Sequence, residues 1–178
     1  MNVEIIEAGP ELKSVVCNLG RYYIHDFTEF IGFRCSETGL YRADCWDKYW
    51  QQPGHCAFLV KVDGELAGFV LIENQGVLPQ TQWSIGEFFI MRKFRRRGIG
   101  RQVAFSMFDR FRGRWEVRQV VQNAPATAFW RKVIDRYTDG KYHELPEPVR
   151  HGQWTDIVQT FDNARTRPTG TRGESLGL

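Results

Sequence analysis

The sequence offers none of the spacings by which cysteine or histidine usually marks a metal site or a disulfide framework. Its four cysteines contain no CxxC pair, and its four histidines are scattered. No metal site is therefore predicted. Because a chain of 178 residues can bury a full core without cross-links, we expect free thiols, which favours a reducing cytoplasm. The cysteines are Cys17, Cys35, Cys45 and Cys56.

Long apolar runs and a strong charge of one sign are also missing. No apolar stretch approaches the roughly 20 residues that span a bilayer, and the N-terminal "MNVEII" lacks the pattern of a signal peptide. The net charge is only +3, so we expect neither a membrane nor a nucleic acid as partner. The apolar fraction of 42% and the aromatic fraction of 14% predict an ordered globular chain.

The order of apolar patterns predicts alternating strands and helices. The strand "VEIIEA" precedes a helix that Pro10 opens, and residues 32–54 form an irregular or loosely helical region rich in aromatic side chains. Two strands then flank Asp63-Gly64, a turn pair typical of an antiparallel hairpin. The strand "WSIGEFFIM", a helix over 98–112, the strand "WEVRQVV", a helix between Asn123 and Gly140, and a final antiparallel pair, "KYHELPEPV" with "WTDIVQTF", complete the order.

This order predicts a single α/β (α+β) domain over residues 1–162. Its sheet is expected to be twisted, mixed and mostly antiparallel, with six or seven strands and helices on both faces. Residues 163–178 are polar and rich in helix breakers, so we expect a mobile or partner-docked tail. The sequence leaves monomer and homodimer open.

The segment "RKFRRRGIGRQ", residues 92–102, concentrates six cations and two glycines between a predicted strand and a predicted helix. A solvated basic face or a nucleic-acid patch would account for the charge, but not for Gly98 and Gly100. A helix N-terminus presents unpaired N–H groups and a partial positive charge, which suits phosphate. Glycines let the backbone approach phosphate oxygens, and arginines add charge-assisted hydrogen bonds. The segment therefore predicts a pyrophosphate-binding loop.

The loop matches neither of two widespread phosphate-binding motifs. It lacks the Gly-Lys-Ser/Thr of a Walker A loop and the G-x-G-x-x-G that follows the first strand of a parallel βαβ unit. Arg95-x-x-Gly98-x-Gly100 instead matches the R/Q-x-x-G-x-G/A signature of the Gcn5-related N-acetyltransferases, the GNAT superfamily. The signature lies between a strand and an amphipathic helix, and a strand, Asn123 and a further helix follow. In this arrangement residues 55–140 resemble the acetyl-CoA core of that superfamily.

The resemblance implies a GNAT-like sheet and an enzyme that uses acetyl-CoA as co-substrate. Acetyl-CoA would lie in a notch between the strands holding "EFFIM" and "WEVRQVV". The backbone near Ile90 would pair with the pantetheine arm, backbone amides of residues 95–101 would hold the pyrophosphate, and the helix after Asn123 would line the far side. The expected cofactor-binding residues are Ile90, Met91, Arg92, Arg95, Arg96, Arg97, Gly98, Ile99, Gly100, Arg101, Asn123, Phe129 and Trp130.

The stretch "GEFFIMRKFRRRGIG" is similar to the corresponding segment of spermidine/spermine acetyltransferases, in which an acidic pair precedes two phenylalanines. Here Gly86 replaces the first acid, and only Glu87 remains. Glu87 is the candidate catalytic residue, which would bind or deprotonate an amine; a carboxylate at the sheet rim is the alternative. The family's frequent general acid, a Tyr, is replaced by Trp130, and Tyr137 lies about two turns further on. Tyr22, Tyr23, His25 and Asp26 either face the acceptor or are helix-end residues in solvent.

Three functions remain open at this point. The first is transfer of an acetyl group from acetyl-CoA to a primary amine of a small molecule, such as a polyamine or an amino sugar, or to a peptide N-terminus, by direct attack. Because only an uncharged amine is nucleophilic, a base or an ordered water must remove its proton. The alternative is a catalytically weak CoA-binding regulator, which Gly86 and Trp130 favour. A nucleic-acid module is the third, although most aromatic side chains lie on predicted buried stripes.

Overall fold

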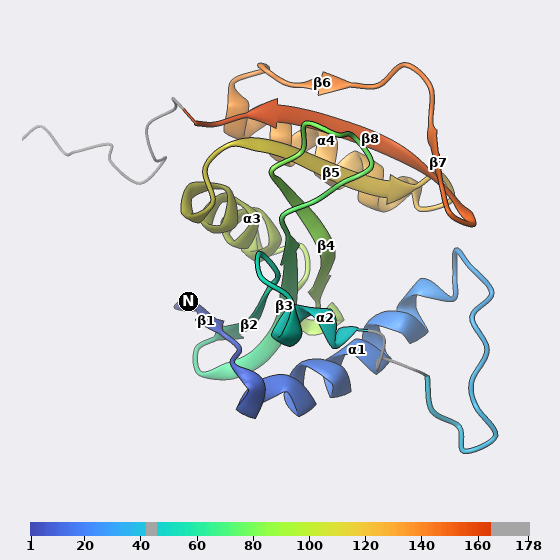
Figure 1. The fold of residues 1–178 in the computed structure, drawn as a ribbon. Helices are drawn as coiled ribbons and strands as arrows, with labels where there is room; N and C mark the ends of the chain where they lie inside the picture. Colours follow the sequence, from blue (N-terminus) through green and yellow to red (C-terminus); the bar gives the residue numbers. More distant parts are fainter. Residues whose placement is uncertain (42–45, 165–178) are drawn as a thin grey trace, which may run out of the picture.

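One twisted sheet organises the chain, as the computed structural model in Figure 1 shows. The structure describes residues 1–41 and 46–164. In these residues the strand order is β1-β2-β3-β4-β5-β8-β6, and β7 also pairs with β8. The strands are β1 Val3–Glu7, β2 Cys56–Val62, β3 Glu65–Glu73, β4 Trp83–Ile90, β5 Arg114–Val120, β6 His143–Glu144, β7 Val149–His151 and β8 Trp154–Asp162. The helices are η1 Pro10–Leu12, α1 Lys13–Phe27, α2 Lys48–Gln51, η3 Arg92–Phe94, α3 Ile99–Arg110 and α4 Ala124–Thr138.

The mixed, mostly antiparallel sheet confirms the predicted fold class, with one difference in strand number. The predicted strand "KYHELPEPV" is divided into β6 and β7, each antiparallel to β8. Pro146 and Pro148 lie between them, where a missing N–H cannot continue the ladder. The β2–β3 hairpin turns at Asp63 and Gly64, both with positive φ (50° and 82°), as the turn pair predicts. Described residues therefore form eight strands rather than six or seven.

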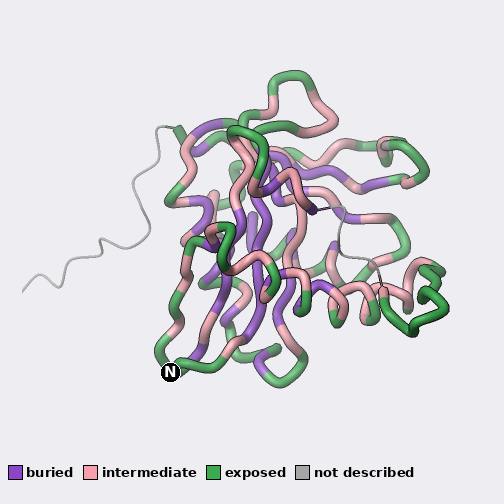
Figure 2. Tube along the Cα trace, turned by 60° about the horizontal axis from the view of Figure 1, so that its bottom comes forward, coloured by how far each residue is buried: buried purple, intermediate pink, exposed green. Residues whose placement is uncertain are grey.

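The two faces of the sheet bury different clusters. Helices α3 and α4 cover one face, and α1 and α2 cover the other (Figure 1). Side chains of β3 alternate between the two clusters, with Val70 and Ile72 under α3 and α4, and Phe69 and Leu71 under α1 and α2. Buried residues follow the central strands through the molecule (Figure 2). Functional side chains on β4 consequently reach one face or the other according to their position along the strand.

Several expectations concern features outside the sheet. Cys35 and Cys56 are free thiols, whereas Cys45 and the predicted tail beyond residue 164 lie outside the described residues. Within residues 1–41 and 46–164, no helix is long and apolar enough to cross a membrane. The same residues contain no group of three or more His, Cys, Asp or Glu side chains that could hold a metal ion.

Candidate active site

Strands β4 and β5 form the only parallel pair among the described strands, and they separate after two residues. Their register contains only Trp83↔Trp115 and Ser84↔Glu116. The pairing of β3 with β4 passes from Ile72↔Ile85 to Leu71↔Glu87, so Gly86 is an extra residue in β4. Such a bulge bends its strand. The outer half of β4 consequently diverges from β5 (Figure 1), as the family resemblance implies; the notch is the region between these two diverging strands.

The bulge also explains why residue 86 is glycine rather than an acid. A Cβ atom at Gly86 would lie 2.0 Å from the Tyr49 hydroxyl oxygen and 2.4 Å from Oε1 of Glu73. Tyr49 and Glu73 therefore fill the space that a side chain at this position would need. The second carboxylate beside Glu87 is thus supplied by β3, and no spacing in the sequence indicated that Glu73 would reach it.

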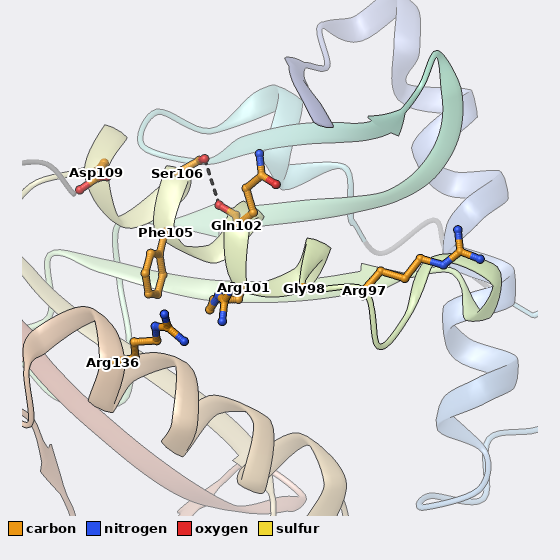
Figure 3. A pocket seen from close by; sticks show the side chains of 8 residues that line it. All are labelled: Arg97, Gly98, Arg101, Gln102, Phe105, Ser106, Asp109 and Arg136. Atoms are coloured by element: carbon orange, nitrogen blue, oxygen red, sulfur yellow. Dashed lines mark hydrogen bonds between the residues drawn. The ribbon is translucent and has the colours of Figure 1, made fainter. Parts of the chain in front are cut away.

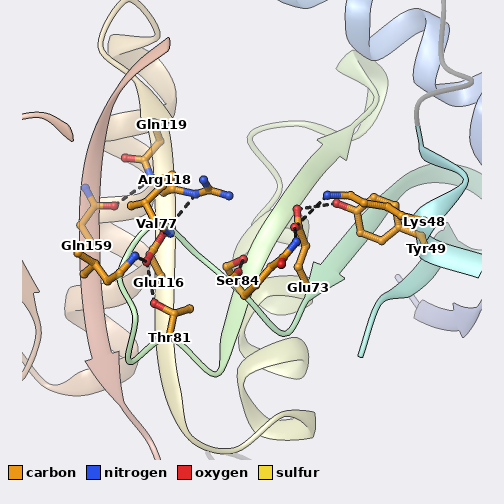
Figure 4. Close-up of polar contacts among 12 residues, drawn as sticks. Lys48, Tyr49, Glu73, Val77, Thr81, Ser84, Glu116, Arg118, Gln119 and Gln159 are labelled. Carbon is orange, nitrogen blue, oxygen red and sulfur yellow. Dashed lines mark hydrogen bonds and ion pairs between the residues drawn. The ribbon is translucent and has the colours of Figure 1, made fainter. Parts of the chain in front are cut away.

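Glu73 is held by side chains from α2. The Tyr49 hydroxyl donates to its Oε1 at 2.7 Å, and Lys48 Nζ donates to Oε2 at 3.0 Å (Figure 4). Burial by itself would raise the pKa of Glu73, but these hydrogen bonds and the Lys48 charge outweigh it and lower the pKa. Glu73 is therefore an ionised, paired carboxylate rather than a free base.

On the other side of the notch, β5 contributes Glu116 and Arg118. Glu116 is fully buried and accepts hydrogen bonds from the backbone amides of Val77 and Leu78 at 2.9 and 3.0 Å, and from the Thr81 hydroxyl at 2.7 Å (Figure 4). These bonds fix the loop between β3 and β4. Arg118 Nε lies 3.3 Å from Oε1 of Glu116, and its guanidinium group points across the notch toward β4. Neither residue was singled out in the sequence, because their contacts depend on the β4–β5 register.

Glu87 lies on β4 beyond the bulge, on the face that α1 covers. Burial is the main reason that the pKa of this carboxyl is raised to about 7; the negative charge of Glu73 acts in the same direction, whereas a hydrogen bond with Tyr23 and the charge of Lys48 act against it. Burial and Glu87 together raise the pKa of the Tyr23 hydroxyl, which therefore stays protonated. A carboxylate with a pKa near neutral pH is suited to accept a proton from a substrate.

The predicted pyrophosphate loop begins helix α3. Gly98, the N-cap, has φ 80°, and Arg96 has φ 63°, so two residues of the loop adopt the left-handed conformation. The first hydrogen bond of the helix runs from Gln102 N to Gly98 O, which leaves the amides of residues 99–101 without a partner inside the helix. Alternation of left- and right-handed residues turns successive N–H groups toward one point and favours an anion.

The two glycines of the signature serve different purposes. A Cβ at Gly98 would meet only the Arg101 side chain, at 3.8 Å, so this glycine is required by its positive φ. A Cβ at Gly100 would lie 3.2 Å from the Phe129 ring. Gly100 therefore allows the first turn of α3 to pack against α4, and its close approach to phosphate stays a prediction.

The arginines of the loop divide into two groups. Arg92 and Arg95 form ion pairs with Asp26 of α1, at 2.8 and 2.6 Å. Arg96, Arg97 and Arg101 are exposed. The side chains of Arg92 and Arg95 are thus engaged by α1, whereas phosphate binding by the loop stays a prediction.

An open pocket of about 470 Å³ adjoins the start of α3. In Figure 3, Arg101 of α3 and Arg136 of α4 point toward each other, with Phe105 beside them, whereas Arg97 extends away. The pocket therefore carries positive charge and one aromatic ring next to the amides of the loop. Arg136 was not predicted from the sequence. The one sequence feature that could have indicated it is its position next to Tyr137, on the apolar stripe of the predicted helix. The lining residues are Arg97, Gly98, Arg101, Gln102, Phe105, Ser106, Asp109 and Arg136.

The far side of the notch is formed by the beginning of α4. Asn123 caps this helix, and its Oδ1 accepts a hydrogen bond from Ala126 N at 3.0 Å. Trp130 is 5% exposed and packs against Phe88 of β4, with ring centroids 5.0 Å apart. Phe129 is half-buried and contacts the same ring at 6.0 Å. Packing between α4 and β4 is therefore part of the role of both aromatic residues.

In this structure a divergent strand pair, β4 and β5, opens beside the N-terminus of α3, whose amides are suited to bind an anion. The profile of the acetyltransferase (GNAT) family matches residues 21–134. The chain belongs to this family: it is an N-acetyltransferase, with acetyl-CoA as co-substrate. Among curated proteins, no sequence matches.

Solved structures share the fold at low sequence identity. An acetyltransferase from Thermus thermophilus is 15% identical, with a TM-score of 0.65 over 91% of this chain and 97% of that chain. A ribosomal-protein-S5-alanine acetyltransferase from Vibrio fischeri is 14% identical, with a TM-score of 0.64 over 94% and 97% of the two chains. Spermidine N-acetyltransferase from Vibrio cholerae, solved with CoA and spermine, is 9% identical, with a TM-score of 0.61 over 91% and 96%.

Proposed function

We propose that this N-acetyltransferase transfers the acetyl group to a primary amine by direct attack, with Glu87 receiving the proton of the amine. The observation that carries this proposal is the position of Glu87, just beyond the bulge that opens the notch, with its pKa raised to about 7. A carboxyl group with this pKa is available as a base near neutral pH and, once ionised, attracts an ammonium group. Tyr23 would orient the Glu87 carboxyl group and Glu73 would raise its pKa, and neither residue would itself react.

The residues of the notch fit acetyl-CoA, which supplies an activated thioester when bound. The unpaired amides of residues 99–101 and the left-handed Gly98 are suited to hold the pyrophosphate. The end of β4, from Ile90 to Arg92, would align the pantetheine arm, with Asn123, Phe129 and Trp130 on the opposite side. Arg101 and Arg136 would hold a phosphate of the nucleotide in the pocket beside α3.

The acceptor is proposed to be a small-molecule amine, such as a polyamine or an amino sugar, or a peptide N-terminus. The two Vibrio enzymes are named for one acceptor of each kind, a polyamine and a protein alanine. Only the fold connects them to this chain. We further propose a cytoplasmic location and a single domain over residues 1–162; the free thiols of Cys35 and Cys56 favour the reducing compartment.

An amine panel tests the proposal. The full chain is incubated with acetyl-CoA and polyamines, amino sugars or peptides with a free N-terminus, and released CoA thiol is measured. At least one class should give turnover that Glu87→Gln lowers by about 100-fold or more, the effect expected for a general base. Acetyl-CoA binding without turnover of any amine would instead identify a CoA-binding regulator.

A further inference from the structure

Asp26, in the last turn of α1, joins this helix to the cofactor loop. Its Oδ1 accepts hydrogen bonds from Arg92, at 3.1 Å from Nε and 2.8 Å from the terminal nitrogen, and its Oδ2 accepts one from Arg95 at 2.6 Å. One carboxylate thus binds both sides of the turn η3, which connects β4 to the loop. The Asp26 side chain is only 21% exposed, so this contact is partly shielded from solvent.

Arg95 extends the contact to the strand that precedes the loop. Its Nε donates to the carbonyl of Ile90 at 2.6 Å, and its guanidinium group lies 5.6 Å from the centre of the Phe89 ring. Arg96, which follows directly, has the positive φ that turns the loop. Arg95 therefore fixes the last carbonyl of β4 and the first residue of the loop at once.

The same helix contacts the proposed base. Tyr23 lies one turn before Asp26, on the same side of α1, and its hydroxyl interacts with Glu87. Helix α1 consequently touches both the acetyl-accepting side of the notch and the cofactor loop. Although partial burial opposes ionisation, the hydrogen bonds from Arg92 and Arg95 lower the pKa of Asp26, so its charge is present at neutral pH.

We propose that Asp26 is a positioning residue: it holds the cofactor loop in its anion-binding conformation through Arg92 and Arg95, and so couples acetyl-CoA binding to helix α1. The inference depends on acetyl-CoA being the co-substrate, but not on Glu87 being the base or on which amine accepts the acetyl group.

Loss of Asp26 should weaken acetyl-CoA binding rather than free two arginines for phosphate. Arg95 lies over Phe89, in the cluster that α1 covers, whereas the unpaired amides open at the start of α3. Arg92 and Arg95 are three residues apart in one turn, so without Asp26 their like charges would repel and loosen η3. Ordering the loop would then have to occur during binding, which reduces affinity.

The test compares Asp26→Asn with a matched control in the same turn. Glu65→Gln removes the ion pair of Glu65 with Lys93, at 2.6 Å, which also ties η3 to a neighbouring element but does not involve α1. Calorimetric titration of the full chain with acetyl-CoA should give a Kd about 5- to 10-fold higher for Asp26→Asn, the range of moderate coupling energies. Glu65→Gln should stay within about 2-fold of the wild type.

Hydrogen exchange provides the readout of coupling. Acetyl-CoA should slow amide exchange in residues 22–28 of the wild type and of Glu65→Gln, but not of Asp26→Asn. Should Asp26→Asn not fold, Arg92→Gln replaces it, because Arg92 is 69% exposed and its loss removes only one side of the contact.

Three results would overturn the inference: equal Kd values for Asp26→Asn and Glu65→Gln, tighter binding by Asp26→Asn, or acetyl-CoA slowing amide exchange in residues 22–28 of Asp26→Asn as much as in the wild type. Failure of the wild type to bind acetyl-CoA would instead contradict the use of acetyl-CoA itself. The amine panel addresses Glu87 and the acceptor separately.

Discussion

Replacing Glu87 by Gln should stabilise the protein while it abolishes most activity. In the folded chain the pKa of Glu87 is about 7, compared with 4.5 for an ordinary glutamate, mainly because the carboxyl group is buried. Between these two values the unfolded chain releases a proton that the folded chain retains. The free energy of unfolding therefore falls as the pH rises from about 4.5 to about 7, and the loss is complete above that range.

The size of the effect follows from the two pKa values. At 1.36 kcal/mol per pKa unit, the difference between 4.5 and about 7 corresponds to at most about 3 kcal/mol. Gln has the shape of the protonated acid and carries no charge, so it avoids this penalty and can still accept a hydrogen bond from Tyr23. The variant should match the wild type near pH 4.5 and exceed its stability by about 1–3 kcal/mol at pH 8.

Urea unfolding at a series of pH values from 4.5 to 8 measures the difference directly. Glu147→Gln, which changes an exposed carboxylate in the loop before β7, serves as the control and should show no such trend. In parallel, kcat/KM of the wild type should rise with pH through about 7, because the base must lose its proton. A stability difference that does not change with pH would refute the raised pKa and, with it, the role assigned to Glu87.

Three further substitutions test the cofactor side of the site. Gly98→Val should raise the Kd for acetyl-CoA at least about 10-fold because a β-branched residue is strained at φ 80°. Gly98→Asn should bind acetyl-CoA nearly as tightly as the wild type does. An unchanged Kd for Gly98→Val in calorimetry would contradict this role of the glycine. Trp130→Ala should lower the free energy of unfolding by about 3–5 kcal/mol, as measured in urea. Trp130→Tyr should change kcat only modestly. A gain in kcat of about 100-fold in Trp130→Tyr would show that a missing general acid limits the enzyme. Arg136→Gln should weaken the binding of acetyl-CoA more than the binding of dephospho-CoA, which lacks the 3′-phosphate. If calorimetry finds equal losses of affinity for the two compounds, Arg136 does not bind that phosphate.

The conformation of the proposed cofactor loop could largely be predicted from the sequence because it is local. The glycines, the cations and the helix that follows lie within residues 92–112, so the backbone conformation and the helix N-terminus depend on neighbours in the chain. Even there, the separate reasons for Gly98 and Gly100 were not visible. Gly100 is explained by Phe129, which is 29 positions away and reaches it only because α4 packs against α3.

The acceptor side was less predictable because its contacts are made by the tertiary fold. Glu73 meets Glu87 only through the β3–β4 register, and the bulge at Gly86 decides which residues face each other. Asp26 lies 66 positions before Arg92. In the sequence alone, the charges of both segments are equally consistent with side chains that face solvent. Composition and spacing indicate such residues but do not pair them.

The two departures from the family pattern have different consequences for catalysis. Gly86 is compensated, because Glu73 and Tyr49 occupy the space of the missing side chain and Glu73 supplies the second negative charge. Tyr137 does not take over the role of the family's tyrosine, whose place Trp130 occupies. Its hydroxyl donates to Asp109 at 2.9 Å and accepts a hydrogen bond from Asn163 at 3.2 Å, and burial raises its pKa to about 12. A thiol resembling that of cysteine, with a pKa near about 8.5, leaves as a thiolate without a dedicated acid. Proton removal from the amine is then the step for which this chain must supply a group, and Glu87 is suited to it.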